Sequence, residues 1–156
     1  MPLAVAGALA VRGVSLAVRG GEIVGIAGVS GNGQRQLVEV LAGQREADSG
    51  EVRVRGERYA ASRKEMRRHK MSLLPEEPLK NACVGGMSVA DNIAFREFDR
   101  APFAKSGWWL NRSAFRKEAE RKIGLYKIKT RTPDTPISAL SGGNVQRAVL
   151  ARELGG

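Results

Sequence analysis

Residues 140–147 read LSGGNVQR, a serine and two glycines at the start of a predicted helix. Serine is a typical N-cap, because its side chain can satisfy an amide that the first helical turn leaves unpaired. Apolar residues follow at helical spacing, at Val145, Ala148, Val149 and Leu154. The stretch therefore predicts that Ser141 starts the last helix of the chain.

A glycine-rich turn, GVSGNG at residues 28–33, lies far upstream between an apolar run and a helical pattern. The run IVGIA at 23–27 has strand length and suits burial on both faces, and residues 34–42 have helical spacing. Such a loop can turn its backbone N–H groups towards one anion, assisted by the helix dipole. The residues expected to contact a nucleotide are Gly28, Ser30, Gly31, Asn32, Gly33, Gln34 and Arg35.

Two positions depart from a complete phosphate loop, G-x-x-x-x-G-K-[ST]. Gln34 replaces the lysine that would place a charge on the phosphates, and Arg35 replaces the hydroxyl that would ligate Mg²⁺. Losing one charge-assisted hydrogen bond costs about 1.5–3 kcal/mol, or roughly tenfold to a hundredfold in affinity. Arginine has no lone pair for a metal, although it can contact a phosphate directly. Alone, this loop is equally compatible with a strand-to-helix turn that binds nothing.

The two motifs together resemble those of ABC ATPases. LSGGN at 140–144 is similar to the signature motif L-S-G-G-Q, and it lies about 110 residues after the loop, as in that family. Pro75-Glu76-Glu77 resembles the Q-loop, with Glu76 where most members have glutamine, so Glu76 joins the expected nucleotide-binding residues. MSVADN at 87–92 resembles the start of the helical subdomain. The lysine-free loop, acidic Q-loop and LSGGN signature are similar to the second ATPase half of simple-sugar and nucleoside importers.

The resemblance implies an α/β fold, a P-loop NTPase-like ABC nucleotide-binding domain with an antiparallel β edge and a helical subdomain. We expect a phosphate-loop core with a β subdomain at 1–87, the helical subdomain at 88–137, and the signature motif with its helix at 138–156. The Walker B strand, D-loop and switch histidine of the family do not occur by residue 156. The domain is therefore expected to be incomplete at its C-terminus.

Local patterns complete the expected secondary structure. Beyond the elements at the two motifs, strands are expected at 9–19, 51–55 and 71–74, and helices at 63–70, 88–95 and 113–125. Residues 130–137 hold two prolines and are expected to form a linker.

The resemblance also implies a division of labour between two ATPase halves. In this family ATP lies between the phosphate loop of one half and the signature of the other. The residues that would complete the partner's site are Leu140, Ser141, Gly142, Gly143, Asn144 and Gln146. The chain's own site would bind ATP and Mg²⁺ weakly or not at all. Other implied partners are transmembrane permease subunits and, indirectly, a substrate-binding protein, with the chain peripheral on the cytoplasmic face of the plasma membrane.

No catalytic or metal-binding residue can be assigned in this chain. His69, the one histidine, lies too early to be the switch residue of the family, and a histidine in a basic run is expected to be solvated. Without the Walker B glutamate there is no evident general base for water. The chain by itself is therefore expected not to hydrolyse ATP.

The charge leaves two other function classes open. A net charge of +10 favours anionic partners, although much of it lies at 53–70 and 112–131, which can be plain solvated faces. A nucleic-acid-associated ATPase of this type is one alternative. Aromatic residues make up 5% of the chain and no groove-reading motif occurs, so nucleic acid is not expected as a partner. A non-catalytic dimerisation domain is the other alternative.

Several smaller features carry expectations of their own. Cys83 is the single cysteine, so no internal disulfide can form. Residues 1–11 lack the basic start of a signal peptide, and a linker with a first strand is the simpler interpretation. Trp108 and Trp109 either face a permease or pack inside the helical insert. Glu76 and Glu77 either report the nucleotide state to a permease or form a charged loop.

Overall fold

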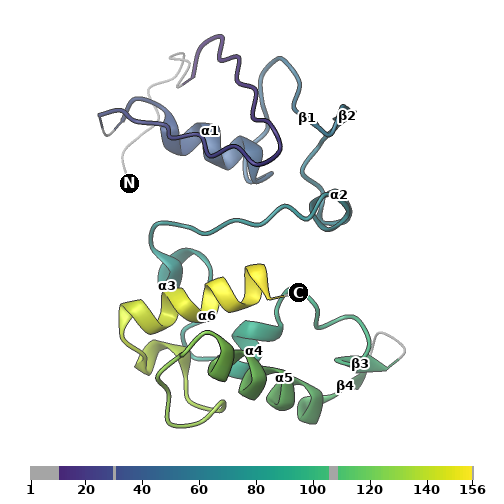
Figure 1. The fold of residues 1–156 in the computed structure, drawn as a ribbon, viewed down its shortest axis with the longest axis vertical. Coiled ribbons are helices and arrows are strands. Elements are labelled where there is room, and N and C mark those ends of the chain that lie inside the picture. Colours follow the sequence, from purple (N-terminus) through teal and green to yellow (C-terminus); the bar gives the residue numbers. More distant parts are fainter. Residues whose placement is uncertain (1–10, 30, 106–108, 156) are drawn as a thin grey trace. The chain divides into compact units, whose positions relative to one another are not determined.

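The computed structural model describes residues 11–29, 31–105 and 109–155. The chain divides into two compact units, Met1–Met71 and Ser72–Gly156, called here the N-terminal and C-terminal units. Figure 1 shows that the N-terminal unit contains α1, α2 and a small hairpin, whereas the C-terminal unit is mainly helical. Among the described residues, no helix has both the length and the apolar character needed to cross a membrane.

The N-terminal unit contains a single small hairpin in its described part. Strand β1 (Arg53–Val54) pairs antiparallel with β2 (Glu57–Arg58). Arg55 and Gly56 between them have φ of 54° and 81°, as a two-residue type I′ turn requires. Strand β1 lies within the strand predicted at 51–55, but it is shorter.

Two helices flank this hairpin in the sequence. Helix α1 (Gln34–Leu41) follows the glycine-rich loop, and α2 (Arg63–Arg68) begins after Ser62. Ser62 and Glu65 form a capping box, in which each side chain bonds the backbone of the other residue. The hydrogen bond from the Ser62 hydroxyl is the main cause that lowers the pKa of Glu65. Both helices lie where the sequence predicted them.

His69, at the C-cap of α2, is buried, so the prediction of a solvated histidine is wrong. Its ring packs edge-on against Tyr59, with ring centres 6.1 Å apart. Its Nε2 lies 3.6 Å from a carboxylate oxygen of Glu57. Both neighbours come from the hairpin region about ten residues upstream, and local sequence around His69 does not reveal them.

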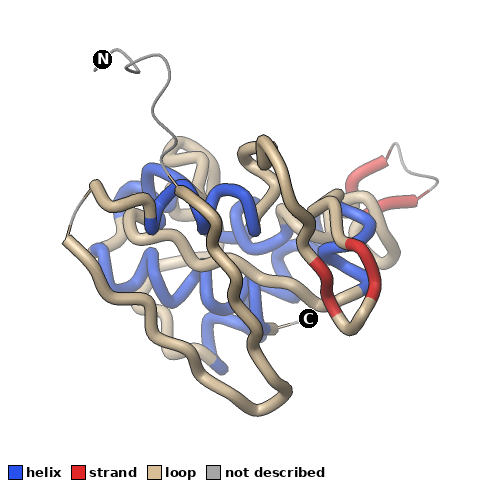
Figure 2. Tube along the Cα trace, turned by 90° about the horizontal axis from the view of Figure 1, so that it is seen from above, coloured by secondary structure: helices blue, strands red, loops and turns tan. Residues whose placement is uncertain are grey.

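Three predicted strands are not formed in the described residues, namely those at 9–19, 23–27 and 71–74. Of the first, residues 9–10 lie outside the described part of the chain. Figure 2 draws strand at the two short hairpins, with the long N-terminal segment as loop. Ile23 is 98% exposed, although its run was expected to be buried. A strand needs a hydrogen-bonded neighbour, and no described residue pairs with this run. Its apolar side chains therefore stay in solvent.

Three helices build the core of the C-terminal unit. Helix α4 (Val89–Ala94) packs against both α5 (Arg112–Leu125) and α6 (Gly142–Leu154). All three lie within one or two residues of their predicted positions. The short helices α3 (Pro78–Asn81) and η1 (Ile137–Ala139) complete the unit. The buried core consists of Val89, Ala90, Ile93, Ala119, Ile128, Ile137, Val145, Ala148 and Ala151.

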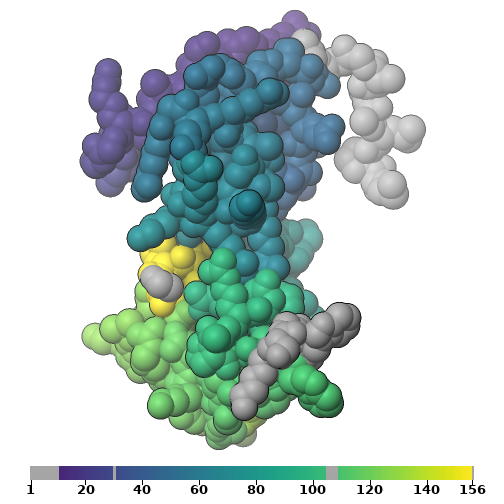
Figure 3. Space-filling view, turned by 90° about the vertical axis from the view of Figure 1, so that its right-hand side faces the viewer, coloured from purple at the N-terminus to yellow at the C-terminus, as the bar shows by residue number. Residues whose placement is uncertain are grey.

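A second hairpin lies at one edge of this unit. Strand β3 (Ala104–Lys105) pairs antiparallel with β4 (Trp109–Leu110). Phe103 packs on Phe115 of α5, with ring centres 5.4 Å apart. Trp109 is 79% exposed, so the alternative that it packs inside the insert is wrong, while Trp108 lies outside the described residues. The end of α6, yellow in Figure 3, also reaches the surface.

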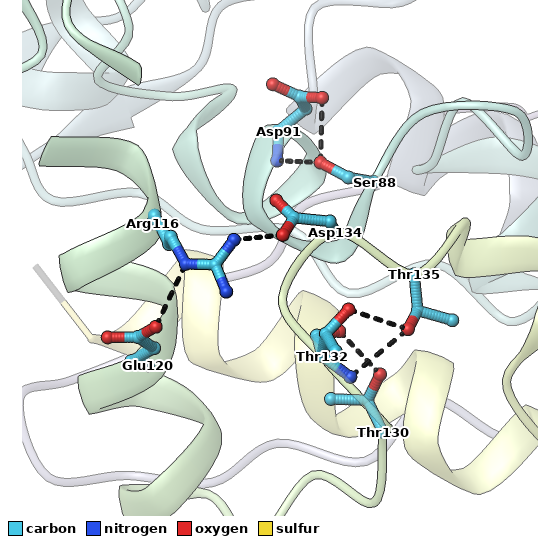
Figure 4. Close-up of polar contacts among 8 residues, drawn as sticks. All are labelled: Ser88, Asp91, Arg116, Glu120, Thr130, Thr132, Asp134 and Thr135. Carbon is cyan, nitrogen blue, oxygen red and sulfur yellow. Dashed lines mark hydrogen bonds and ion pairs between the residues drawn. The ribbon is translucent and has the colours of Figure 1, made fainter. Parts of the chain in front are cut away.

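The predicted linker at 130–137 is held firmly against α4. The backbone N–H groups of Val89 and Ala90 donate to the carbonyls of Thr135 and Pro133, both at 2.9 Å. These bonds satisfy amides that the first turn of a helix otherwise leaves unpaired. Figure 4 shows Arg116 reaching from α5 to Asp134 in the same segment. The linker thus fixes the chain immediately before the signature helix.

Candidate functional site

The glycine-rich loop has the backbone shape that its glycines permit. Gly31 and Gly33 have φ of 96° and 97°, in the left-handed region that favours glycine. The Asn32 N–H donates to the Val29 carbonyl at 3.2 Å, which closes a turn. Gly33 is the N-cap of α1 and makes no side-chain cap bond. The first amides of α1 therefore remain available to an anion. Ser30 lies outside the described residues.

The two unusual residues of the loop are both engaged within the chain. The Gln34 amide folds back over Gly28, where a Cβ would overlap its Nε2, and it lies 3.4 Å from the Val29 carbonyl. The Arg35 guanidinium pairs with Glu39 one turn further along α1, at 2.8 Å. Hydrogen bonds from Arg35 and then Arg45 lower the pKa of Glu39. Neither side chain places a free charge at the loop.

The donor set of this loop does not fit Mg²⁺. The metal prefers carboxylate, carbonyl or hydroxyl oxygens in octahedral geometry, and Arg35 occupies the hydroxyl position without a lone pair to offer. Within residues 11–29, 31–105 and 109–155, no three His, Cys, Asp or Glu side chains gather into a group that would hold a metal ion.

The start of α6 is open. Ser141 is the N-cap, with φ of −64°, and its hydroxyl makes no cap bond to the helix backbone. Instead its Oγ accepts a hydrogen bond from Asn144 Nδ2 at 2.9 Å. Ser141, Gly142 and Gly143 are all exposed. The Asn144 N–H donates to the Ser141 carbonyl at 2.8 Å, but the amides of Gly142 and Gly143 have no acceptor inside the helix and lie exposed together with this hydroxyl.

The two signature glycines have no steric reason to be glycine within this chain. Neither has a positive φ, and a Cβ added to either would meet no atom within 4 Å. Glycine inside a helix costs about 0.5–1 kcal/mol relative to alanine. The chain therefore carries a small cost here that its own packing does not explain.

Of the remaining signature residues, two make contacts within the chain and one is exposed. Asn144 Oδ1 accepts from the Lys129 backbone N–H at 2.8 Å while its amide holds Ser141. Leu140 packs partly buried against the core, whereas Gln146 is exposed. Asn144 thus fixes both the serine hydroxyl and the backbone one residue before the linker. Its supporting role was not evident from the sequence, because Lys129 lies fifteen residues away.

The acidic pair at 76–77 lies in the C-terminal unit, with the signature, while the glycine-rich loop lies in the N-terminal unit. Glu76 is exposed, and Glu77 is the N-cap of α3 and pairs with Lys80 at 3.1 Å.

A fold of this kind is known from a solved ATPase. The chain is similar to the dimeric, post-hydrolysis structure of the ATP-binding cassette MJ0796 bound to ADP and Pi, with a TM-score of 0.69 and 21% sequence identity. The similarity covers 93% of this chain and 61% of that one. The predicted fold class, an α/β ABC nucleotide-binding domain, is therefore confirmed.

The family model described as ABC transporter matches residues 11–155, and the chain belongs to this family. It is 34% identical over 149 residues to the nucleoside import ATP-binding protein NupA of Lactococcus lactis, covering 95% of this chain and 29% of NupA. It is 39% identical over 148 residues to the glucose import ATP-binding protein TsgD13 of Haloferax volcanii, covering 93% and 27%. The arabinose import ATP-binding protein AraG of Azospirillum brasilense is 40% identical over 142 residues, covering 90% and 27%. The chain thus spans less than a third of these relatives.

Proposed function

We propose that this chain acts as an ATP-binding component of an ABC importer of the sugar or nucleoside class. Its similarity to nucleoside, glucose and arabinose import ATP-binding proteins supports this class. In this role it lies peripherally on the cytoplasmic face of the plasma membrane, against permease subunits that receive substrate from a binding protein. Closure of two ATPase halves around ATP would switch the permease between its two access states.

The part that this chain contributes is the signature at the start of α6. The observation that carries the proposal is the pair of glycines, Gly142 and Gly143, with open space where side chains would be. Bare amides at a helix start bind phosphate, and the absence of Cβ atoms permits close approach from outside the chain. We infer that these amides and the Ser141 hydroxyl grip the terminal phosphate of an ATP held by the partner half.

The chain's own phosphate loop contributes little. Gln34 supplies a neutral amide where a lysine would supply a charge, and Arg35 is held by Glu39. The absent charge-assisted bond corresponds to about tenfold to a hundredfold weaker ATP binding. The loop is accordingly a weak site, and the domain boundaries at residues 87 and 137 remain part of this proposal.

The test compares one substitution in each region within the assembled ATPase pair. Ser141→Arg places a bulky side chain where the phosphate would lie, so ATPase activity should fall about a hundredfold or more. Gln34→Ala removes only a weak contact and should change activity by less than about threefold. Equal losses would overturn the assignment of roles. A pair that binds no nucleotide at the Ser141 site would favour a dimerisation module instead.

A further inference from the structure

The acidic segment at 76–77 is anchored on both sides by the last turn of α6. Upstream of it, the Ser72 hydroxyl donates to the Glu153 carbonyl at 2.9 Å. Downstream, Arg152 Nη1 donates to the carbonyl of Ala82, the C-cap of α3, at 2.6 Å. Two consecutive residues of α6 therefore hold both ends of the segment that runs from Ser72 to Ala82.

A buried ion cluster makes this anchor rigid. The Arg152 Nε bonds the Glu153 carboxylate at 2.9 Å, and both side chains are less than a tenth exposed. Arg96, just beyond α4, pairs with the same carboxylate. The Glu153 carboxylate is thus paired with two guanidinium groups, and Arg152 uses its planar fork to reach a carboxylate and a carbonyl at once. This cluster could not be predicted from the sequence, because charged residues near a helix end usually lie in solvent.

One helix therefore joins two features that the sequence places far apart. Its first turn carries the signature amides, and its last turn holds the segment with Glu76 and Glu77. The helix between them is tightly packed, with Val145, Ala148, Val149 and Ala151 all buried. A packed helix moves as a unit, so a displacement at one end is passed to the other.

We propose that Arg152 is a positioning residue that transmits engagement of the signature to the Glu76–Glu77 segment. This inference rests on the proposed function, because the signal begins when the start of α6 meets the partner's ATP. Arg152 touches no nucleotide in this scheme. It acts by fixing the end of α3, so that the acidic segment follows the movement of α6.

The single cysteine provides a probe at the right place. Cys83 follows Ala82 directly and is half-buried. Burial raises the pKa of its thiol, an effect partly offset by the nearby charge of Arg152. Arg152→Lys keeps that charge but cannot bond Glu153 and the Ala82 carbonyl through one planar fork. A change in thiol reactivity in this variant then reports loosening of the segment and not a lost charge.

The first experiment uses the free chain and a thiol-reactive disulfide reagent. Arg152→Lys should speed the reaction of Cys83 about tenfold, and speed amide exchange at Asn81 and Ala82 similarly. The matched control is Arg147→Lys, since Arg147 lies on the same helix but bonds the Lys127 carbonyl at 3.2 Å. The control should leave both rates unchanged. Ser72→Ala, which removes the exposed anchor, should loosen the segment less and serves if Arg152→Lys does not fold.

The second experiment adds the partner ATPase half and ATP. ATP should change the reactivity of Cys83 in the unaltered chain, and Arg152→Lys should abolish this change while ATP affinity stays within about threefold. The relay would be overturned if Arg152→Lys left the Cys83 reaction and amide-exchange rates of the free chain unchanged. It would also be overturned if ATP changed Cys83 reactivity in Arg152→Lys, or did not change it in the unaltered chain. If instead Ser141→Arg leaves ATPase activity intact, the proposed function fails, whatever the free-chain rates show.

Discussion

Glycines precede helix α1 and form the first two residues of helix α6, and they are present for opposite reasons. At α1, Gly31 and Gly33 have φ near 96°, so the chain's own backbone requires glycine there. At α6, Gly142 and Gly143 have no such φ and face open space. The comparison teaches that a glycine motif can be required by the chain's own backbone conformation or by the close approach of another molecule. The surroundings of the missing Cβ distinguish the two.

The side chains at the two helix starts differ in the same way. At α1, Gln34 folds over the loop and Arg35 is tied to Glu39. At α6, Asn144 holds the Ser141 hydroxyl away from the helix amides, which leaves them open. The side chains at the start of α1 contact groups of their own loop and helix, while the signature leaves its amides open to another molecule.

The largest effect should come from closing the open start of α6. Gly143→Ala in the assembled ATPase pair should lower ATPase activity about a hundredfold, because the methyl group keeps the partner's phosphate from the amides. Steady-state turnover with purified pair measures this. Gly86→Ala is the control, since Gly86 is exposed and also has nothing within 4 Å of its Cβ position. Equal turnover in both variants would mean that nothing approaches Gly143.

Restoring the lysine charge to the phosphate loop should restore part of its ATP affinity and so reduce the difference between the two helix starts. Gln34→Lys combined with Arg35→Ser gives the loop a cation and a hydroxyl, and ATP affinity of the chain should rise about tenfold to a hundredfold. Calorimetric titration of ATP in Mg²⁺ buffer measures the change. Gln34→Leu with Arg35→Ser is the matched control and should show no gain. An unchanged affinity in the lysine variant would show that more than charge has been lost from this loop.

Alanine at the two helix starts should move stability in opposite directions. Gly31→Ala forces a side chain into a left-handed φ and should destabilise the N-terminal unit by about 1–2 kcal/mol. Gly143→Ala should stabilise the C-terminal unit by up to about 1 kcal/mol. Urea unfolding, followed by a probe in each unit, separates the two. If Gly143→Ala instead lowered the stability of the C-terminal unit, the fold of this chain itself would require glycine at position 143.

The smallest effect concerns the pairing of Arg35. Because Arg35 and Arg45 lower the pKa of Glu39 in the folded chain, this carboxylate favours folding at neutral pH. The contribution is lost as pH falls through the lowered pKa. Arg35→Ser should raise the pKa of Glu39 towards its usual value, as a carboxyl NMR titration would record. Because Arg45 also lowers this pKa, the rise should be partial, and a pKa that does not rise at all would mean that Arg35 does not pair with Glu39.

Helices were predictable from the sequence where caps and apolar spacing agree. Ser88 and Ser141 mark helix starts, and the periodic pattern behind each gives its buried face. The strand at 23–27 was not predictable in the same way, since a strand depends on a neighbour that local sequence does not name. His69 and the Arg152–Glu153 cluster were missed for a related reason. The partners of His69 are Glu57 and Tyr59, and those of the cluster are Ala82 and Arg96. All four lie well away in the sequence from the residues they contact.

The most direct test of the account follows the backbone amides of Gly142 and Gly143 by NMR in isotope-labelled chain mixed with the partner ATPase half. On addition of a non-hydrolysable ATP analogue, both amide protons should shift strongly downfield, as charge-assisted bonds to phosphate form. In the Ser141→Arg variant the shift should vanish. If both amides keep their free-chain positions while the analogue is bound by the pair, the start of α6 does not hold that phosphate.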